Sequence, residues 1–459
     1  MAIELSNLTF TEQDDVVPAF GVEQIVNTGI ANTLAGNDTI NGRGGKYSIL
    51  NIGTLNTADG NDIITGLPSE FDQDRNDFGA GIRNEGGTIY TDNGNDTITG
   101  WHNANQRENS FDGYGIDNER GIIDTGNGDD YITGVNQIRG GVGIQSLGGI
   151  INTGDGNDRI IATARVGISS VETAFNTGNG DDRIEATSNT EFGIGIINQS
   201  GSIDTGAGND LIAGRGFVGI ANTIGSIIDT GDGNDMISTL SNQTGIENYG
   251  IINTGNGQDS IIPRGGNLIN WGGVFLGDGN DSLTADDAYK PDNPSPLRNF
   301  NAIETGEGND IITSTDGIYN EGIINTGNGD DSIIVDGGSD GTGIGYGIYN
   351  NGGAIITGSG NDSIIANEGF ESGSKSSGAW FLGDGEDYIK GFGSGDFYGG
   401  NGNDTLELTP GIYTVGIWDR VTFSKGNSLM LASEFEQLIA GNTIYDFTSL
   451  TAGQIIIVS

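Results

Sequence analysis

Apolar and polar positions follow one another in a fixed order along most of this chain. In INTGNGDDSIIV (324–335), a Gly-rich polar run ends at Asp331, and Ile333 follows two residues later. Apolar residues two apart, as in DSIIV (331–335) and DTITG (96–100), are typical of short strands with alternate side chains facing a core. The Gly-rich runs predict tight turns, because Gly accepts positive φ and close backbone approach.

This polar run occurs 15 times. Aligned on its last Asp, it has Gly two residues before the Asp in every copy and four residues before it in 12, the exceptions being Leu34, Ala58 and Asp92. Every copy has Ile or Leu two residues after the Asp. The aligned positions are Asp38, Asp62, Asp96, Asp130, Asp158, Asp182, Asp210, Asp235, Asp259, Asp281, Asp310, Asp331, Asp362, Asp387 and Asp404. The regularity indicates one structural unit repeated along the chain.

A second, looser turn signal lies between the motifs. Examples are GIRNEGG (81–87), GIENYG (245–250) and GIYNEG (317–322). A repeat this short cannot bury its own apolar face, but parallel stacking lines up the Ile positions in ladders and the turns in columns. The sequence therefore predicts an all-β fold, a parallel β-helix or β-roll-like solenoid of about 15 coils with capped ends.

The boundaries of the array follow from where the motifs start and stop. We expect an N-terminal cap over residues 1–28, the repeats over 29–408, and a C-terminal cap over 409–459, where the composition changes. YKPDNPSPLRNF (289–300) carries three of the seven prolines and is predicted to be a long surface loop within the array.

Composition excludes several other classes of protein. The chain has 459 residues, of which 84 are Gly and 7 are Pro, but Gly does not recur every third residue as in collagen. Hydrophobic residues make up only 34%, yet their fixed offsets argue against disorder. Since Cys is absent, the chain has no disulfide and no thiolate metal site.

The charge is strongly one-sided. With 63 acidic and 18 basic residues, the formal net charge is −45, which argues against nucleic acid and anionic membranes as partners. No run of 18 apolar residues predicts a membrane span, and the first residues, MAIELSNLTFTEQDD, lack the features of a cleaved signal. The expected partner is a cation.

The motif Asp residues are the candidate ligands for that cation. Fifteen carboxylates stacked at strand spacing repel one another, so something must neutralise them. Asp carboxylates and turn carbonyls suit Ca²⁺, whereas zinc prefers Cys and His, and His102 is the only His. We predict Ca²⁺ at all 15 positions, with Asp38, Asp62 and Asp96 the weakest because their turns lack the earlier Gly. A metal-free solenoid, in which Asn and Asp only cap turns, stays open as an alternative.

At this point the residues resemble a known family. TGDGNDRI (153–160) and YGGNGNDTL (398–406) are similar to the G-G-x-G-x-D-x-U-x nonapeptide of the repeats-in-toxin (RTX, haemolysin-type) calcium-binding repeats. The resemblance implies calcium between adjacent coils, chelated by residues such as Asp158 and Asp404. In this chain most motifs are single, Thr often replaces the first Gly, and the opposite turn has no carboxylate column. We therefore expect a wider solenoid with one calcium column at most.

The tail over 409–459 also resembles the end of an RTX export substrate. The resemblance implies type I secretion and an extracellular or cell-surface location. A tail that only caps the solenoid is the alternative, and the two roles are compatible.

Two further classes of function have some basis. β-Helices host polysaccharide-active enzymes, but no Ser–His pair can be placed, and His102 is predicted to be an exposed loop residue. The four Trp residues share no repeat offset, as a sugar-binding stripe would require. We therefore predict no enzyme, with a polysaccharide-active or sugar-binding protein as the alternative.

Ice binding or surface adhesion is a further alternative, since it needs a flat ladder of Thr. Thr recurs just before the first Gly of the motif, at Thr125, Thr153, Thr177, Thr205, Thr230, Thr254, Thr305, Thr326 and Thr357. The leading prediction is a secreted, calcium-binding structural or cell-surface solenoid that folds on binding Ca²⁺, with an unidentified cell-surface or self-association partner.

Overall fold

The structure, a computed structural model, contains two compact units, Met1–Ile251 and Ile252–Ser459. Each unit is built from parallel strands wound into coils, with about 14 turns in the chain as a whole, so the predicted all-β parallel solenoid is confirmed. The residues described are 2–18, 23–67, 79–103, 113–137, 140–286, 296–337, 347–372 and 378–459.

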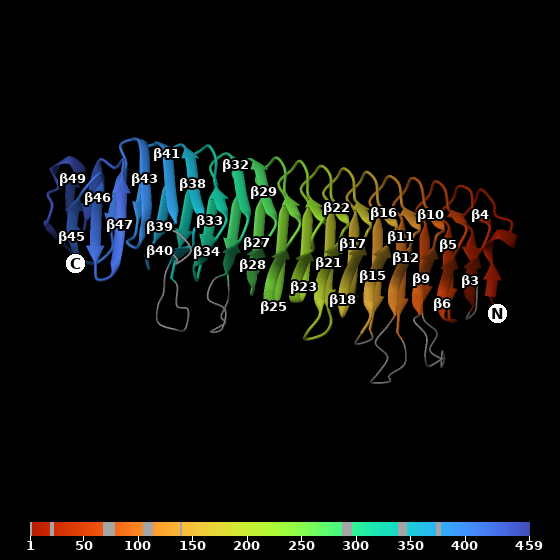
Figure 1. Cartoon of the computed structure of the whole chain (residues 1–459). Coiled ribbons are helices and arrows are strands. Elements are labelled where there is room, and N and C mark those ends of the chain that lie inside the picture. The colour runs from red at the N-terminus through yellow and green to blue at the C-terminus, as the bar shows by residue number, and fades with distance from the viewer. Residues whose placement is uncertain are drawn as a thin grey trace. The chain divides into compact units, whose positions relative to one another are not determined.

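A full coil has three strand positions, which we name from the sequence motifs. A post-motif strand starts directly after the motif Asp, an Asn strand contains the Asn of the second turn signal, and a pre-motif strand leads into the next Gly-rich turn. Within each unit, strands of one class lie side by side in successive coils (Figure 1).

In the first unit the chain begins with β1 (Ala2–Glu4), the 3₁₀ turn η1 (Leu5–Asn7) and β2 (Val16–Val17). The post-motif strands are β5 (Thr39–Arg43), β8 (Ile63–Leu67), β11 (Thr97–His102), β14 (Tyr131–Asn136), β17 (Arg159–Ala164) and β20 (Arg183–Ser188). The Asn strands and their equivalents are β3 (Gln24–Asn27), β6 (Tyr47–Asn51), β9 (Ala80–Glu85), β12 (Tyr114–Glu119), β15 (Val142–Leu147), β18 (Val166–Val171) and β21 (Ile194–Gln199). Both classes merge in β23 (Leu211–Asn222) and β25 (Met236–Asn248). The pre-motif strands are β4 (Ile30–Asn32), β7 (Thr54–Asn56), β10 (Thr88–Tyr90), β13 (Ile122–Asp124), β16 (Ile150–Asn152), β19 (Ala174–Asn176), β22 (Ser202–Asp204), β24 (Ile227–Asp229) and, where the units divide, β26 (Ile251–Asn253).

The second unit repeats the same order. Its post-motif strands are β27 (Ser260–Arg264), β30 (Ser282–Ala285), β33 (Ile311–Ser314), β36 (Ser332–Val335), β39 (Ser363–Ala366), β42 (Tyr388–Lys390) and β44 (Thr405–Leu408). Its Asn strands and their equivalents are β28 (Asn267–Asn270), β31 (Leu297–Asn299), β34 (Ile318–Asn320), β37 (Ile348–Asn350) and β40 (Phe370–Ser372). Its pre-motif strands are β29 (Gly273–Asp278), β32 (Ala302–Glu307), β35 (Ile323–Asn325), β38 (Ala354–Ser359), β41 (Ala379–Gly385) and β43 (Gly395–Gly402).

Antiparallel pairing appears only in the C-terminal segment of the described chain. There β45 (Gly411–Ile417) pairs with both β46 (Val421–Lys425) and β50 (Ile455–Val458). The remaining elements are β47 (Ser428–Ser433), β48 (Gln437–Ala440), β49 (Thr443–Asp446) and the 3₁₀ turn η2 (Phe447–Ser449). The predicted limits of the caps stay predictions.

The core is a set of aligned apolar ladders. Ile98 lies opposite Ile132, and Ile132 lies opposite Ile160, on three successive post-motif strands. The Ile or Leu two residues after each motif Asp is at most 1% exposed in all 15 copies, as predicted. Each such side chain contributes about 1.5–3 kcal/mol on burial.

The second turn signal has a structural meaning that the sequence did not reveal. The Asn residues of this signal are buried and hydrogen-bonded in a ladder, in which the Asn51 Nδ2 donates to Asn84 Oδ1 (2.8 Å) and the Asn84 Nδ2 donates to Asn118 Oδ1 (2.9 Å). In the second unit, the Asn270 Nδ2 donates to Asn299 Oδ1 in the same way (2.9 Å). An amide suits this position because it both donates and accepts.

Two predictions about local structure are wrong in part. Within the predicted loop over 289–300, residues 289–295 lie outside the described residues, but Leu297–Asn299 form β31 and both end residues are fully buried, because Asn299 continues the Asn ladder. His102 is the last residue of β11 and is partly buried, because the strand continues there in register with β14.

The Gly-rich turns require both positive φ and close approach. Gly154 has φ of +84°, and a Cβ on it would lie 1.7 Å from the carbonyl oxygen of Gly126 in the preceding coil. The three motif positions without this Gly keep the conformation, with φ of +69° at Leu34, +61° at Ala58 and +60° at Asp92. The three residues that replace Gly therefore adopt a positive φ, like the Gly of the other copies.

Replacing Gly154 by Ala should destabilise the protein more than replacing Gly225. Both have similar φ, +84° and +79°, but a Cβ on Gly225 meets nothing within 4 Å. The left-handed strain of about 1–2 kcal/mol is therefore shared, and steric overlap should add roughly 1–3 kcal/mol at Gly154 alone. Urea denaturation of the two variants measures the difference, and equal losses would show that coil spacing tolerates a Cβ.

Candidate metal centre

The structure gathers the motif Asp residues inside the coils. All 15 are at most 2% exposed. Asp38 to Asp235 belong to the first unit, and Asp259 to Asp404 belong to the second. Each side chain points inward from its turn, while the residues before and after it face outward. Asp38, Asp62 and Asp96, predicted to be the weakest candidates, are as deeply buried as the others.

Within each unit, one carboxylate oxygen of the motif Asp residues ties neighbouring turns together. The backbone N–H of Asp130 donates to Asp158 Oδ1 (2.8 Å), and the N–H of Asp158 donates to Asp182 Oδ1 (2.8 Å). In the second unit, the N–H of Asp281 donates to Asp310 Oδ1 in the same way (2.8 Å). This ladder satisfies backbone donors in the turns, as the capping alternative requires. An Asn could accept the same bond, so the ladder explains only half of each carboxylate.

The second oxygen, Oδ2, is buried in the same column. In 13 of the described copies it has no hydrogen-bond partner. A buried oxygen that carries part of a negative charge and lacks a partner is costly, so its repetition needs an explanation. The copies are Asp38, Asp62, Asp96, Asp130, Asp158, Asp182, Asp210, Asp281, Asp310, Asp331, Asp362, Asp387 and Asp404.

A Thr hydroxyl lies near many of these carboxylates. Thr125 precedes Asp130 by five residues, and a hydrogen bond from its hydroxyl to the Asp130 carboxylate would lower the pKa of Asp130. The hydroxyl has a single proton, however, and Thr125 donates it to the carbonyl oxygen of Thr153 (3.4 Å). Its oxygen lone pairs consequently remain available to a cation in the column.

Burial dominates the ionisation of the column. Desolvation raises the pKa of Asp130 to about 8, and the backbone N–H of Asp96 and the Thr125 hydroxyl only partly offset it. Burial likewise raises the pKa to about 7 at Asp182 and to about 6 at Asp158. The neighbouring carboxylates of Asp158 and Asp181 raise the pKa of Asp182 further. An ionised column without a bound cation is therefore unfavourable near neutral pH.

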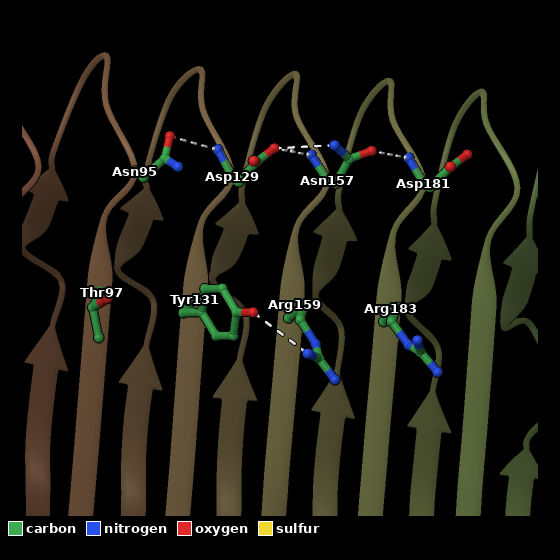
Figure 2. Close-up of a pocket in the computed structure, with 8 residues that line it drawn as sticks. All are labelled: Asn95, Thr97, Asp129, Tyr131, Asn157, Arg159, Asp181 and Arg183. Carbon is green, nitrogen blue, oxygen red and sulfur yellow. Dashed lines mark hydrogen bonds between the residues drawn. The ribbon is translucent and has the colours of Figure 1, made fainter.

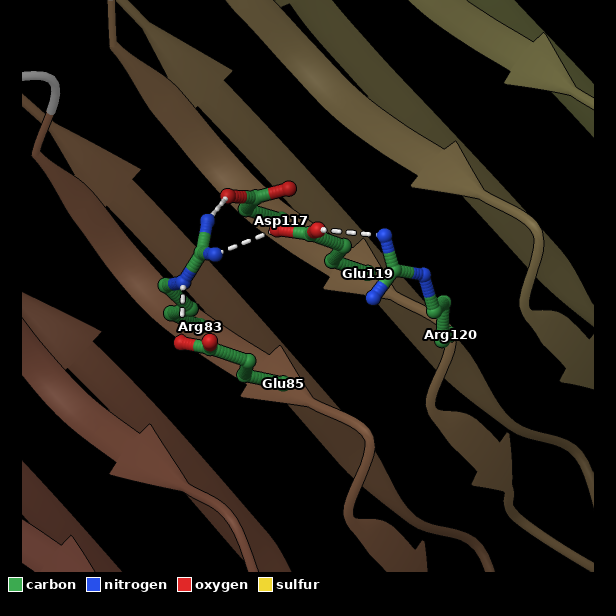
Figure 3. A network of polar contacts seen from close by, with 5 residues as sticks. All are labelled: Arg83, Glu85, Asp117, Glu119 and Arg120. Atoms are coloured by element: carbon green, nitrogen blue, oxygen red, sulfur yellow. Dashed lines mark hydrogen bonds and ion pairs between the residues drawn. The ribbon is translucent and has the colours of Figure 1, made fainter.

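A different buried carboxylate shows how this chain neutralises charge elsewhere. Asp117 of β12 has a 2% exposed side chain, and Arg83 of β9 binds both Asp117 and Glu119 (Figure 3). The Arg83 Nε also donates to Glu85 (3.1 Å). Burial raises the pKa of Asp117, and Arg83 lowers it. Among the described residues, no ion pair joins Lys or Arg to Asp130, Asp158, Asp182 or the other motif Asp residues apart from Asp235 and Asp259.

The donor set of the column suits a hard cation. Carboxylate, hydroxyl and carbonyl oxygens are the ligands that Ca²⁺ prefers. Within the described ranges, no group of three or more His, Cys, Asp or Glu side chains comes together as a metal site. Each coil supplies one motif carboxylate, so backbone carbonyls, Thr hydroxyls and water would have to complete the six to eight ligands of Ca²⁺.

A second polar ladder, which the sequence reasoning missed, lies on the outside of the same turns. Asp129 accepts the backbone N–H of Asn157 (2.9 Å), and Asn157 Oδ1 accepts that of Asp181 (2.8 Å) (Figure 2). A sequence signal was available, because the residue before the motif Asp is Asn, Asp, Gln or Glu in every copy. The N–H of Asn157 is thus bound by Asp129 of the preceding coil, whereas the N–H of Asp158 is bound by Asp182 of the following coil.

The Thr ladder proposed for ice binding is not on the surface. All nine residues of that ladder are fully buried, because each occupies an inward position two residues after a buried core residue. Thr153, for example, follows the buried Ile151 and the partly exposed Asn152. This column therefore offers no flat external face.

No family model matches the chain, and no curated protein matches it. Among solved structures, it is similar to a hyperactive, Ca²⁺-dependent, β-helical antifreeze protein from an Antarctic bacterium, with 16% sequence identity, a TM-score of 0.40, and coverage of 98% of this chain and 95% of that chain. The RTX assignment consequently stays a prediction. Among the described residues, no helix is both long enough and apolar enough to cross a membrane.

Proposed function

We propose that this chain is a calcium-binding structural solenoid, in which Ca²⁺ held by the motif Asp column completes folding. The observation that carries the proposal is the row of buried, unpartnered Oδ2 atoms, repeated in 13 copies. A divalent ion would neutralise these 13 carboxylates, with which no described Lys or Arg forms an ion pair. Capping alone does not account for Asp, because Asn accepts the same N–H bond without adding charge.

Calcium fits the column better than other common ions. Zinc prefers Cys and His ligands, and the sequence has no Cys and a single His, His102, at the end of β11. Magnesium demands near-ideal octahedral geometry and releases water reluctantly, whereas Ca²⁺ tolerates irregular sets of oxygen ligands. Protons are the main competitor, because a carboxyl with a raised pKa is partly protonated near neutral pH.

We propose a structural rather than a catalytic role for the motif Asp column, and the enclosure of its side chains supports this proposal. The motif carboxylates are closed off by their own coils, so they support the protein from inside and are not presented to a substrate. We further propose an extracellular or cell-surface location with type I export, supported by the sequence resemblance of residues 409–459. Export of an unrelated passenger carrying residues 405–459 tests this part, and a retained passenger would contradict it.

Calcium binding should be saturable, specific and dependent on the column. We expect chelator-stripped protein to bind several Ca²⁺ ions per chain in equilibrium dialysis at neutral pH, and excess Mg²⁺ should not displace them. A variant with Asp158, Asp182 and Asp210 all replaced by Asn should bind fewer ions. Replacing the exposed Asp129 and Asp181 by Asn is the matched control and should leave the tightly bound ions in place. Equal binding by the two variants would contradict the proposed location.

A further inference from the structure

A groove of about 540 Å³ runs across four coils on the outer surface of the first unit. One side is the turn row, the Asn and Asp side chains from Asn95 to Asp181 that precede the motif Asp (Figure 2). The other side is the strand row, the side chains from Thr97 to Arg183 that follow it, on β11, β14, β17 and β20. The motif Asp residues themselves face away from this groove, so it is distinct from the column.

Two Arg residues of the strand row are direct neighbours. Arg159 and Arg183 lie opposite each other in the register of β17 and β20, although like charges at such positions are destabilising. The chain has only 18 basic residues among 459, so two Arg side by side need an explanation. Both lie near Glu185, with closest nitrogen–oxygen distances of 3.8 Å and 3.4 Å.

The hydrogen-bonding capacity of this Arg pair is largely unused within the protein. Arg159 donates one long bond, 3.4 Å, to the Tyr131 hydroxyl, and no described residue accepts a hydrogen bond from the Arg183 side chain. A guanidinium has five N–H donors arranged in a fork that matches a carboxylate. In Figure 2, both guanidinium groups lie on the side of the groove away from the turn row. The pair is thus suited to an external carboxylate.

Tyr131 adds an aromatic surface to the strand row. Tyr131 is 39% exposed, and the Arg159 guanidinium lies 5.6 Å from the ring centroid. On its other side, Tyr131 lies opposite the smaller Thr97 in the register of β11 and β14. An exposed ring beside polar groups suits a ligand with one apolar face and one polar edge.

The turn row supplies acceptors rather than donors. Asp129 Oδ1 accepts both the N–H and the Nδ2–H of Asn157, at 2.9 Å and 3.1 Å. Asp181 Oδ1 accepts the equivalent pair from Asn209, at 2.8 Å and 2.9 Å. No described residue donates to the Oδ2 atoms of Asp129 and Asp181, so each can accept a hydroxyl proton from a ligand.

We propose that this groove binds a carboxylated sugar chain, an oligosaccharide that contains uronic acid. Sugar hydroxyls would donate to the turn row, a pyranose ring would pack on Tyr131, and the carboxylate would bind the Arg159 and Arg183 guanidinium groups. A simple inorganic anion matches the Arg pair only and is repelled by Asp129 and Asp181. A neutral sugar leaves the Arg donors unmatched, and an acidic peptide makes no use of the Tyr131 ring.

Calorimetry with defined oligosaccharides tests the proposal. A hyaluronan tetrasaccharide, which contains glucuronate, should bind the full chain in calcium-containing buffer, and the neutral chitotetraose should bind more weakly. Replacing both Arg159 and Arg183 by Gln should lower the affinity for the acidic sugar roughly tenfold or more, since bonds to charged groups are strong. Tyr131→Ala should weaken binding, while Tyr131→Phe should retain most of it.

Arg165→Gln is the matched control, because Arg165 is an exposed residue between β17 and β18, outside the groove. It removes the same charge and should leave the affinity unchanged. The proposal is overturned if the acidic sugar does not bind, if chitotetraose or a tetraglutamate peptide binds as tightly, or if the double Gln variant behaves like the control. These outcomes do not depend on whether the motif Asp column binds calcium.

Discussion

In the presence of a chelator, the protein should be more stable at about pH 5 than at about pH 8. Burial raises the folded-state pKa of 13 motif Asp residues above the ordinary Asp value of 3.8, to about 8 at Asp130 and to about 7 at Asp182, for example. Between these pH values the folded chain binds more protons than the unfolded chain. Stability therefore falls as pH rises from the unfolded pKa through the folded pKa.

The effect should be large because the column repeats the same group. Ten motif Asp residues have a pKa raised to between about 6 and about 8. Even about 2 kcal/mol at each would sum to more than the roughly 5–15 kcal/mol by which domains are stable. The column cannot then be fully ionised without cations in a folded chain. Urea denaturation followed by circular dichroism, at both pH values, measures the change.

Two controls separate the column from the acidic surface. Exposed carboxylates also repel one another at high pH, but about 0.5 M salt screens them while affecting buried groups much less. The pH effect should therefore persist in salt, and saturating Ca²⁺ should largely abolish it. Equal stability at the two pH values in chelator would show that the buried Oδ2 atoms are satisfied in some other way.

The regular parts of this fold could be predicted because they depend on short-range pattern. Ile132 and Ile160 are core rungs for the reason that the sequence shows, an apolar residue at a fixed offset from a Gly-rich turn. Gly154 is required at its position because of both its φ and its contact with Gly126. Each of these requirements acts within one repeat, or between equivalent positions of neighbouring repeats.

Contacts between coils could not be predicted as well, because unequal insertions hide which residues become neighbours. Arg159 and Arg183 are adjacent only when the chain is aligned on the motif Asp. In the second unit, Trp271 and Phe300 stack at 3.8 Å between ring centroids, each one residue after a buried Asn. The positions of Trp alone do not reveal this pair, because the shared offset is occupied by different aromatic residue types.

The burial of the Asp column could be partly inferred, but its bonding could not. Alternation places the motif Asp on the same side as the Ile two residues later, so an inward side chain was available from the pattern. The pattern does not distinguish Oδ1, which accepts an N–H from the preceding coil, from Oδ2, which does not. That distinction separates a capping role from an ion-binding role.

Replacing Asp158, Asp182 and Asp210 together by Asn should have opposite effects with and without calcium. In chelator at about pH 8, the variant should gain roughly 1–3 kcal/mol per residue, because each Asn keeps the Oδ1 acceptor and removes an uncompensated buried charge. The new amide N–H can donate to a Thr hydroxyl oxygen, such as that of Thr177 near Asp182. In saturating Ca²⁺ the same variant should lose stability relative to wild type, by about 2.7 kcal/mol for each site lost at 100 times its Kd.

The corresponding triple Ala variant separates this inversion from a general loss of packing. It removes the Oδ1 acceptors for the backbone N–H groups of residues 130, 158 and 182, so it should lose about 1–3 kcal/mol per bond under both conditions. Urea denaturation of the three proteins, each with and without Ca²⁺, gives the comparison. Suppose that the Asn variant were less stable than wild type in chelator, and that calcium stabilised both proteins by the same amount. The carboxylates would then act as turn caps only. A gain in chelator together with a loss in calcium requires the charge itself, because the Asn and Asp side chains have nearly the same shape and accept the same backbone bond.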